Sequence, residues 1–251
     1  MRKLSILIIC LCLAFGGVVA AQAAEITVSA AASLTNAFTE VKDAFEKKHP
    51  DIKVTTNFAA SNPLLKQMEE GAPVDVFASA DQATMDRAQN GNLIAEASRV
   101  NFALNALVLI TPADNPAAIA AVADLSGDKV KRVAIGNPDS VPAGRYAQEA
   151  LTTANLWAPL QAKYIMGESV RQVLDYVSRG EVDAGFVYNT DALQGGDKVR
   201  VVATATGHTP VSYPIAVTRS AKDAAAAQAF VDFVNSAEGR AVLAKYGFSA
   251  P

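Results

Sequence analysis

The sequence predicts an α/β protein built from alternating strands and helices. Apolar and polar residues alternate from Ile26 to Ala30, which is typical of a strand with one buried face. From Leu34 onward, apolar residues recur at spacings of four, three and four, which is typical of one face of a helix. The same change of period recurs along the chain. Such alternation favours mostly parallel sheets with helices on both faces.

The expected elements follow one another in order. Strands are predicted over residues 26–30, 52–58, 74–78, 101–110, 132–135, 163–166, 183–187, 199–203 and 211–218. Helices are predicted after the junctions at residues 33, 61, 81, 144 and 169, as a turn over 189–193, and as closing helices over 226–234 and 239–246. The runs 101–110 and 211–218 are long enough to carry the chain between two lobes, so we expect them to be crossing strands.

The N-terminal segment has the pattern of a signal peptide. Arg2 and Lys3 precede an uncharged apolar run over residues 4–19, and residues 21–23 have the small-x-small pattern of a signal-peptidase site. We therefore expect residues 1–23 to be removed and the mature chain to be exported.

Composition narrows the functions of the mature chain. Removal of the two N-terminal cations changes the formal net charge from −3 to −5, and no run of Lys or Arg exceeds a pair. Nucleic acid and anionic membrane surfaces are therefore poor partners. Both cysteines, Cys10 and Cys12, lie in the removed segment, so no disulfide framework is expected. His49 and His208, the two histidines, are too few for most metal sites.

Small polar residues follow the first two predicted strands. Ser33 and Ser61 each stand where a strand gives way to a helix. Each serine is either an N-cap residue, which accepts from the first helical turn, or a donor to a bound ligand, and the sequence leaves both readings open. A third junction offers backbone N–H groups at Ala143 and Gly144, since Pro142 can donate none.

Tyr188 stands at the end of another predicted strand. It is either a core aromatic residue whose hydroxyl finds a backbone partner or a donor to a ligand in the same cleft. Helix N-termini attract anions, and ligands of parallel sheets lie beyond the carboxyl ends of the strands. The junctions together predict an anion-binding cleft.

Six motifs occur in the order found in a known protein family. They are AASLTN (31–36), FAAS (58–61), GAPVDVFASAD (71–81), VPAG (141–144), ESVR (168–171) and VY (187–188), and the chain ends with KYGF (245–248). With these motifs the chain resembles the molybdate-binding proteins of bacterial ABC importers over essentially its whole mature length. One departure is Asn62-Pro63, where many relatives have Ser or Thr, so the resemblance implies no extra hydroxyl contact from these positions.

The resemblance implies a type II periplasmic binding protein, with two α/β lobes that are joined by two crossing strands and close on molybdate or tungstate. Residues 24–105 and 212–251 would form lobe 1, and residues 106–211 would form lobe 2. The protein would be a periplasmic monomer that uses no cofactor, delivers the oxyanion to an inner-membrane ABC permease and catalyses no reaction.

The resemblance also implies the ligand-binding residues. Ser33 and Ser61 would give hydroxyl and backbone N–H groups, Ala143 and Val170 would give backbone N–H groups, and Tyr188 would give its hydroxyl. The metal held through these residues would be the molybdenum of the oxyanion itself. Molybdate carries no proton near neutral pH, so a site made only of donors suits it, whereas phosphate largely keeps a proton and needs an acceptor.

Two other functions stay open. The same fold with another cargo, such as sulfate, ferric ion or an organic anion, is one of them, although ferric sites need clustered Tyr, His or carboxylate ligands. An exported serine hydrolase that uses Ser33 or Ser61 is the other, although the chain has no Gly-x-Ser-x-Gly motif. Arg145 and Arg171 lie near the donors in the sequence, but helical geometry can turn both side chains away from a ligand.

Overall fold

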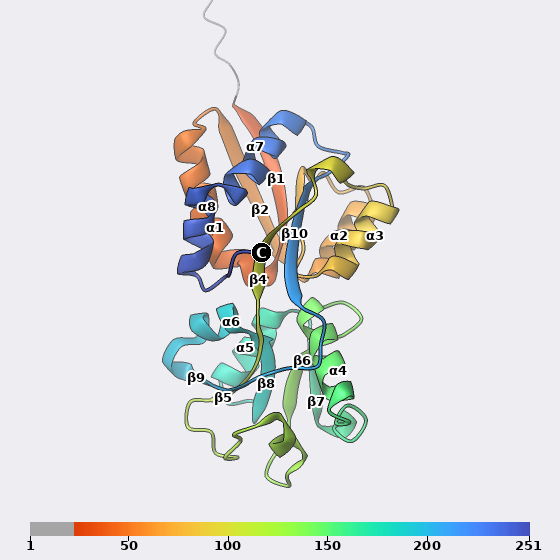
Figure 1. The fold of residues 1–251 in the computed structure, drawn as a ribbon, viewed down its shortest axis with the longest axis vertical. Coiled ribbons are helices and arrows are strands. Elements are labelled where there is room, and N and C mark those ends of the chain that lie inside the picture. Colours follow the sequence, from red (N-terminus) through yellow and green to blue (C-terminus); the bar gives the residue numbers. More distant parts are fainter. Residues whose placement is uncertain (1–22) are drawn as a thin grey trace, which may run out of the picture.

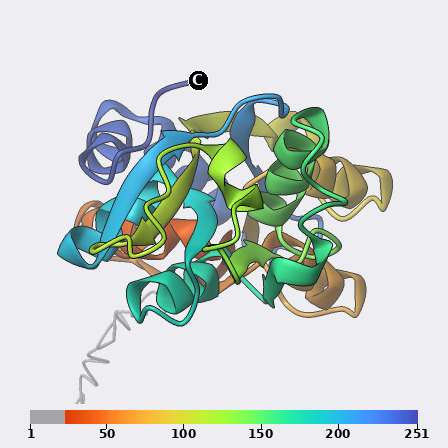
Figure 2. The ribbon, with the colours of Figure 1, turned by 90° about the horizontal axis from the view of Figure 1, so that it is seen from below.

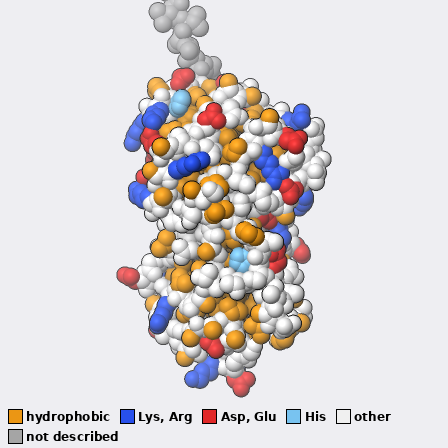
Figure 3. Space-filling model, viewed as in Figure 1, with side chains coloured by type: hydrophobic (Ala, Val, Ile, Leu, Met, Phe, Trp, Pro, Cys, Tyr) orange, Lys and Arg blue, Asp and Glu red, His pale blue; other side chains and the backbone are white. Residues whose placement is uncertain are grey.

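The structure, a computed structural model, describes residues 23–251 and consists of two five-stranded sheets covered by helices (Figure 1). The predicted signal peptide lies, apart from Ala23, outside the described residues and stays a prediction. Among residues 23–251, no helix combines the length and the apolar character needed to cross a membrane. Side chains of both charges are interspersed on the face in Figure 3, which carries no broad basic surface.

The first sheet combines N-terminal strands with one strand from the C-terminal part of the chain. In spatial order its strands are β2 (Ile52–Ala59), β1 (Ala24–Ala31), β3 (Val76–Ala78), β10 (Val211–Val217) and β4 (Val100–Asn105). β1 pairs in parallel with β2 and β3, whereas β10 is antiparallel to both of its neighbours. Four of the five strands therefore run in one direction, which confirms the predicted mostly parallel sheet.

The second sheet repeats this pattern with the middle part of the chain. Its spatial order is β7 (Tyr164–Gly167), β6 (Val133–Gly136), β8 (Ala184–Tyr188), β5 (Leu107–Pro112) and β9 (Val199–Thr204). β6 is parallel to β7 and β8, and β5 is the antiparallel strand. Both sheets are therefore mixed in the same way.

The chain passes from the first sheet to the second between β4 and β5, and it returns between β9 and β10. The run predicted as one strand over 101–110 is interrupted at Ala106, whose N–H donates to Oδ1 of Asn105 at 2.9 Å. A backbone N–H that donates to a neighbouring side chain is no longer available to pair with an adjacent strand. We call the first sheet with its helices the first lobe and the second sheet with its helices the second lobe.

Helices cover both faces of each sheet. They are α1 (Thr35–Lys48), α2 (Ser61–Glu69), α3 (Gln82–Asn90), α7 (Ala224–Asn235) and α8 (Ala237–Lys245) in the first lobe, and α4 (Pro142–Thr153), α5 (Val170–Ser178) and α6 (Asn189–Gly195) in the second. Short 3₁₀ turns are η1 (Ala32–Leu34), η2 (Glu96–Ser98), η3 (Val122–Ser126), η4 (Gln161–Lys163) and η5 (Gly196–Lys198). Figure 1 shows α1, α7 and α8 on one side of the first sheet and α2 and α3 on the other, and Figure 2 shows the strands of the second lobe between its helices.

Side-chain alternation in β3 shows how both faces of the first sheet are buried. Phe77 packs in one apolar cluster with Leu64 of α2 and Met85 of α3, whereas Val76 and Ala78 belong to the larger core on the opposite face. Successive side chains of a strand point to opposite faces of its sheet. Each face of β3 is therefore covered by a different set of helices.

The carboxyl ends of the parallel strands of both sheets meet at the junction between the lobes. β1, β2, β6 and β7 are each followed, directly or after a short loop, by a helix start, and β8 runs directly into α6. Parallel strands present their carboxyl ends at one edge, where ligands of α/β proteins are bound. This topology places all the predicted site residues between the two lobes.

Candidate functional site

A cavity lies between the two lobes, and all five predicted site residues line it. It is small, and its walls are formed mainly by small apolar residues. The predicted residues among its lining are Ser33, Ser61, Ala143, Val170 and Tyr188. Segments that are far apart in the sequence therefore converge as predicted, two from the first lobe and three from the second.

Ser33 lies in η1, the short turn that links β1 to α1. Its side chain is not an N-cap, because α1 begins after Leu34 and makes no side-chain cap hydrogen bond there. The Ser33 hydroxyl instead lies 2.9 Å from the hydroxyl of Tyr213. The N-cap reading of Ser33 is therefore wrong, and its buried side chain is held at the cavity wall by a residue of β10.

Ser61 is the first residue of α2, and its side chain is fully buried. The N-cap position belongs to Ala60, which makes no side-chain hydrogen bond, so the cap reading fails here too. The Ser61 Oγ accepts the backbone N–H of Ala80 at 3.0 Å. Since this bond uses a lone pair of the oxygen, the hydroxyl proton stays available to a ligand.

Two backbone amides come from helix starts in the second lobe. Ala143 and Val170 lie in the first turns of α4 and α5, where N–H groups have no acceptor within their own helix. The start of α4 approaches β6 closely, because a Cβ atom on Gly144 would lie 2.0 Å from the carbonyl oxygen of Gly136. Glycine at residue 144 thus permits the helix start to sit where its amides border the cavity.

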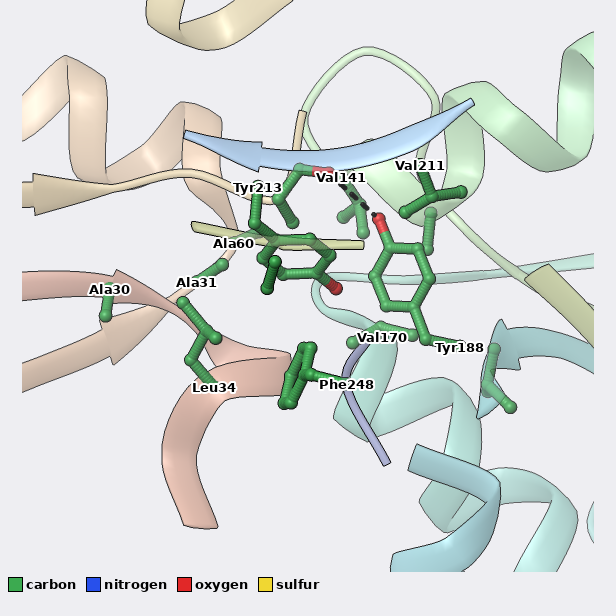
Figure 4. Packing of buried hydrophobic residues seen from close by; sticks show 14 of the residues in the cluster. Ala30, Ala31, Leu34, Ala60, Val141, Val170, Tyr188, Val211, Tyr213 and Phe248 are labelled. Atoms are coloured by element: carbon green, nitrogen blue, oxygen red, sulfur yellow. Dashed lines mark hydrogen bonds between the residues drawn. The ribbon is translucent and has the colours of Figure 1, made fainter. Parts of the chain in front are cut away.

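Tyr188, the last residue of β8, has its hydroxyl 3.5 Å from the carbonyl oxygen of Ala80 (Figure 4). A separation of this length makes at best a weak hydrogen bond, so the proton is available to a ligand. Burial raises the pKa of Tyr188 well above its ordinary value, with a smaller contribution from the neighbouring Tyr213. Tyr188 therefore stays protonated and acts as a neutral donor.

Sequence reasoning missed two residues behind the cavity wall, Tyr213 and Asn105. The Tyr213 ring packs edge to face against Tyr188 with 5.7 Å between ring centroids, and Figure 4 shows the two side by side. Asn105 donates from Nδ2 to the Tyr213 hydroxyl over 3.4 Å. Tyr213 lies inside a predicted crossing strand with no local motif around it. The pairing of β10 with β4 brings Tyr213 and Asn105 together, and the strand order β1-β3-β10 brings them near Ser33, which follows β1.

Arg145 does not line the cavity. Its guanidinium forms an ion pair with Asp81 of the first lobe, with Nε 2.9 Å from Oδ2, and Nη2 donates to Thr84 at 2.9 Å. Asp81 is also the N-cap of α3 and accepts the Thr84 amide at 3.1 Å. The positive charge of Arg145 is thus paired within the protein, across the junction of the lobes.

Arg171, in the first turn of α5, is also paired away from the cavity. Its Nε lies 2.5 Å from Oδ1 of Asp191, but the N–H is not aligned for a hydrogen bond, so the contact is an ion pair. Nη1 donates to Asn36 at 2.7 Å, and Nη2 donates to the carbonyl oxygen of Ser33 at 3.3 Å. Burial raises the pKa of Asp191 to about 6, despite the opposing effect of Arg171.

The cavity therefore offers neutral hydrogen-bond donors to a ligand. Neither histidine lines it: His49 stacks on Phe45, and His208 contacts the carbonyl oxygens of Thr209 and Ala205. Within residues 23–251, no group of three or more His, Cys, Asp or Glu side chains is arranged to hold a metal ion. This donor set suits an anion that brings only acceptors.

Comparison with known proteins bears out both the fold and the resemblance. The chain is 38% identical over 255 residues to the molybdate-binding protein ModA of Haemophilus influenzae, with 100% of each chain covered. It is 37% identical to ModA of Escherichia coli, over 94% of this chain and 93% of that protein. The solved periplasmic molybdate-binding protein of Azotobacter vinelandii has the same fold, with a TM-score of 0.81 at 24% identity over 90% of this chain and 99% of that one.

The family model of the bacterial extracellular solute-binding proteins matches residues 26–249, almost all of the chain that the structure describes. The structural match to the Azotobacter vinelandii protein covers 90% of this chain and so extends over both lobes. The chain is a member of the bacterial extracellular solute-binding protein family.

Proposed function

We propose that this chain captures molybdate or tungstate outside the cytoplasmic membrane and delivers it to an ABC import permease. The observation that carries the proposal is the convergence of neutral donors from five separate segments on one small cavity between the lobes. The full-length relatives of Haemophilus influenzae and Escherichia coli are named as molybdate-binding proteins, which supports this choice of cargo.

In this proposal Ser33 and Ser61 each donate a hydroxyl and a backbone N–H to the oxyanion. Ala143 and Val170 donate their backbone N–H groups, and Tyr188 donates its hydroxyl. These groups make about seven donors, and a hydrogen bond to a charged acceptor contributes roughly 1.5–3 kcal/mol. After the cost of immobilising the ligand, at least ~4 kcal/mol, the remainder is sufficient for micromolar or tighter binding.

The donor set favours an oxyanion that carries no proton. Molybdate, tungstate and sulfate each bring four acceptor oxygens, whereas phosphate keeps a proton near neutral pH and needs an acceptor. Both nearby cations, Arg145 and Arg171, are paired with carboxylates. The site therefore attracts the negative charge of an anion through helix dipoles and hydrogen bonds. Phosphate would leave its own proton, or a protein donor, without a partner.

Sulfate is the second candidate cargo, because it has the same charge and the same tetrahedral shape as molybdate. The names of the relatives, rather than the hydrogen-bond chemistry, favour molybdate over sulfate. A serine hydrolase is disfavoured because neither histidine lies at the cavity to act as a base. The solute-binding family likewise supports a protein that binds and releases its ligand unchanged.

Isothermal titration of the mature protein with molybdate, tungstate, sulfate and phosphate tests the proposal. We expect saturable binding of molybdate and tungstate with one ion per chain, together with much weaker binding of phosphate. Sulfate binding as tight as that of molybdate would overturn the choice of cargo. An absence of binding for all four ions would overturn the site itself. Size-exclusion chromatography with light scattering tests the further proposal that the protein is a monomer.

A further inference from the structure

A chain of hydrogen bonds runs behind the cavity wall to one of its serines. It starts at the side chain of Asn105, the last residue of β4, continues to the hydroxyl of Tyr213 in β10 over 3.4 Å and ends at the hydroxyl of Ser33 over 2.9 Å. Hydroxyl groups can donate or accept, so the direction of each bond has to be deduced from the surrounding partners.

The side-chain amide of Asn105 fixes the direction of the hydrogen bond between Asn105 and Tyr213. Its Oδ1 accepts the backbone N–H of Ala106 at 2.9 Å, which places the NH₂ group on the other side. That nitrogen donates to the hydroxyl of Thr190 at 2.9 Å and faces Tyr213. If the side-chain amide of Asn105 were rotated by 180°, its NH₂ group would face the N–H of Ala106. The hydrogen bond with Ala106 would be lost, and a donor would be left unpaired. Asn105 is therefore a donor to Tyr213.

The direction of the hydrogen bond between Tyr213 and Ser33 follows from the single hydroxyl proton of Tyr213. Tyr213 is fully buried, and the hydrogen-bonding groups that reach its hydroxyl within residues 23–251 are those of Asn105 and Ser33. If Ser33 donated to Tyr213, the phenolic proton would have no acceptor, and a buried donor without a partner is destabilising. The satisfied arrangement is the one in which Tyr213 donates to the Ser33 oxygen.

We propose that Asn105 and Tyr213 are positioning residues that give Ser33 an incoming hydrogen bond, so that the Ser33 proton is directed at a fully deprotonated oxyanion in the cavity. The inference deepens the proposed function and depends on it. Ser61 is held in the same way, since its oxygen accepts the Ala80 amide at 3.0 Å. Each serine oxygen thus receives one hydrogen bond from the protein.

This arrangement makes the ligand's protonation state part of its recognition. A serine hydroxyl with free rotation offers a ligand either a proton or a lone pair, whereas the held Ser33 favours giving its proton. Burial raises the pKa of Tyr213 far above its ordinary value, so the phenol keeps its proton and the chain keeps its direction at every physiological pH. An oxyanion that carries a proton then has no acceptor at Ser33.

A double-mutant cycle tests whether Tyr213 acts through Ser33. Molybdate affinity is measured by isothermal titration for the wild type, Tyr213→Phe, Ser33→Ala and the double variant. Phenylalanine keeps the ring that packs against Phe102 and Phe248 and removes only the hydroxyl. We expect Tyr213→Phe to weaken binding about tenfold in the wild-type background, the equivalent of ~1.4 kcal/mol, and less than about twofold in the Ser33→Ala background.

Tyr164→Phe is the matched control, because its hydroxyl donates to the carbonyl oxygen of Trp157 at 3.1 Å and lies outside the cavity. Equal losses of affinity in both Ser33 backgrounds, or no loss in Tyr213→Phe, would overturn the positioning role. If Ser33→Ala abolishes binding, a second double-mutant cycle pairs Asn105→Ala with Tyr213→Phe. The loss of molybdate affinity caused by Asn105→Ala should then be smaller in the Tyr213→Phe background than in the wild type. A wild type that fails to bind molybdate overturns the proposed function, and this inference with it.

Discussion

Nη2 of Arg171, in the second lobe, donates to the backbone carbonyl of Ser33, in the first lobe, at 3.3 Å. The neighbouring Nη1 donates to the side chain of Asn36, also in the first lobe, at 2.7 Å. The contact joins the lobes at a residue that lines the cavity. Any motion that separates Ser33 from α5 must break both hydrogen bonds, so they stabilise the arrangement in which the cavity is enclosed.

Arg171→Gln should therefore speed the release of molybdate. Two hydrogen bonds from a charged donor are lost, and a loss of about 1.5 kcal/mol from the enclosed state corresponds to roughly tenfold faster dissociation. The association rate should change little, because the bonds form after the ligand has entered. Stopped-flow measurements of tryptophan fluorescence give both rates.

Arg179→Gln is the matched control for Arg171→Gln, since residue 179 follows the other end of α5 and, among residues 23–251, pairs only with exposed Glu181. It should leave both rates unchanged. Arg171→Gln also leaves Asp191 buried without its partner, so folding is checked by circular dichroism. Asn36→Ala tests the same contact from the opposite lobe and should raise the dissociation rate by a smaller factor. Unchanged dissociation in both variants would contradict the role of this contact.

The charge of Asp191 predicts how stability changes with pH. Its pKa is about 6 in the folded protein, above the value of 3.8 of a free side chain, mainly because burial disfavours the ionised carboxylate. The positive charge of Arg171 opposes this shift. Tyr188 and Tyr213 are the other titratable groups that face Asp191. The folded state then binds the proton more tightly than the unfolded state. The resulting stabilisation is complete below about pH 4 and is lost as the pH rises through about 6.

Urea unfolding of the wild type and of Asp191→Asn between about pH 4 and pH 7 measures this effect. Asparagine keeps the shape of the protonated acid but does not titrate. The free energy of unfolding of the wild type, relative to the variant, should fall by on the order of 2–3 kcal/mol as the pH rises across this range. A relative stability that rises with pH would show that Arg171 outweighs burial.

The two predicted hydroxyl donors can be removed singly. Ser33→Ala and Tyr188→Phe should each weaken molybdate binding by about 1–3 kcal/mol, because each variant leaves an anionic oxygen without one donor. Isothermal titration measures the change, and thermal unfolding without ligand should show a much smaller difference between the variants and the wild type. Unchanged affinity in both variants would mean that the anion is bound elsewhere.

Sequence periodicity was enough to predict the strand–helix junctions, because each junction is local. Ser33, Ser61 and Val170 all follow a strand and precede or begin a helix, and such changes of period are visible in the chain. The role of Tyr213 depends on a hydrogen bond to a residue 180 positions away in the chain, which no local pattern records. Local preference also misled at Ser33, since serine favours N-caps while the buried phenol of Tyr213 holds its side chain instead.

The division of the run 101–110 had a similar cause. Its apolar composition is typical of one long strand, but the side chain of Asn105 takes the Ala106 amide and ends the pairing there. The same asparagine then donates to Tyr213. The residue that breaks the predicted strand is thus one of the two that set the hydrogen bonding of Ser33. The contact with Ala106 is local, whereas the contact with Tyr213 exists only in the folded chain.

Gly144→Ala should damage the site without removing any donor. A Cβ atom at residue 144 would lie 2.0 Å from the carbonyl oxygen of Gly136, so the start of α4 must move away from β6. This movement carries the Ala143 amide away from the cavity, and we expect molybdate affinity to fall at least about tenfold, together with a loss of about 1–3 kcal/mol of stability from the overpacked contact.

Gly180→Ala separates the effect at Gly144 from a general cost of replacing glycine. Residue 180 has a φ of +68° and open space around its Cα, so alanine there strains the backbone far from the cavity. It should lower the unfolding temperature while leaving molybdate affinity unchanged, whereas Gly144→Ala should lower both. Wild-type affinity in Gly144→Ala would mean that the Ala143 amide contributes little to holding the anion.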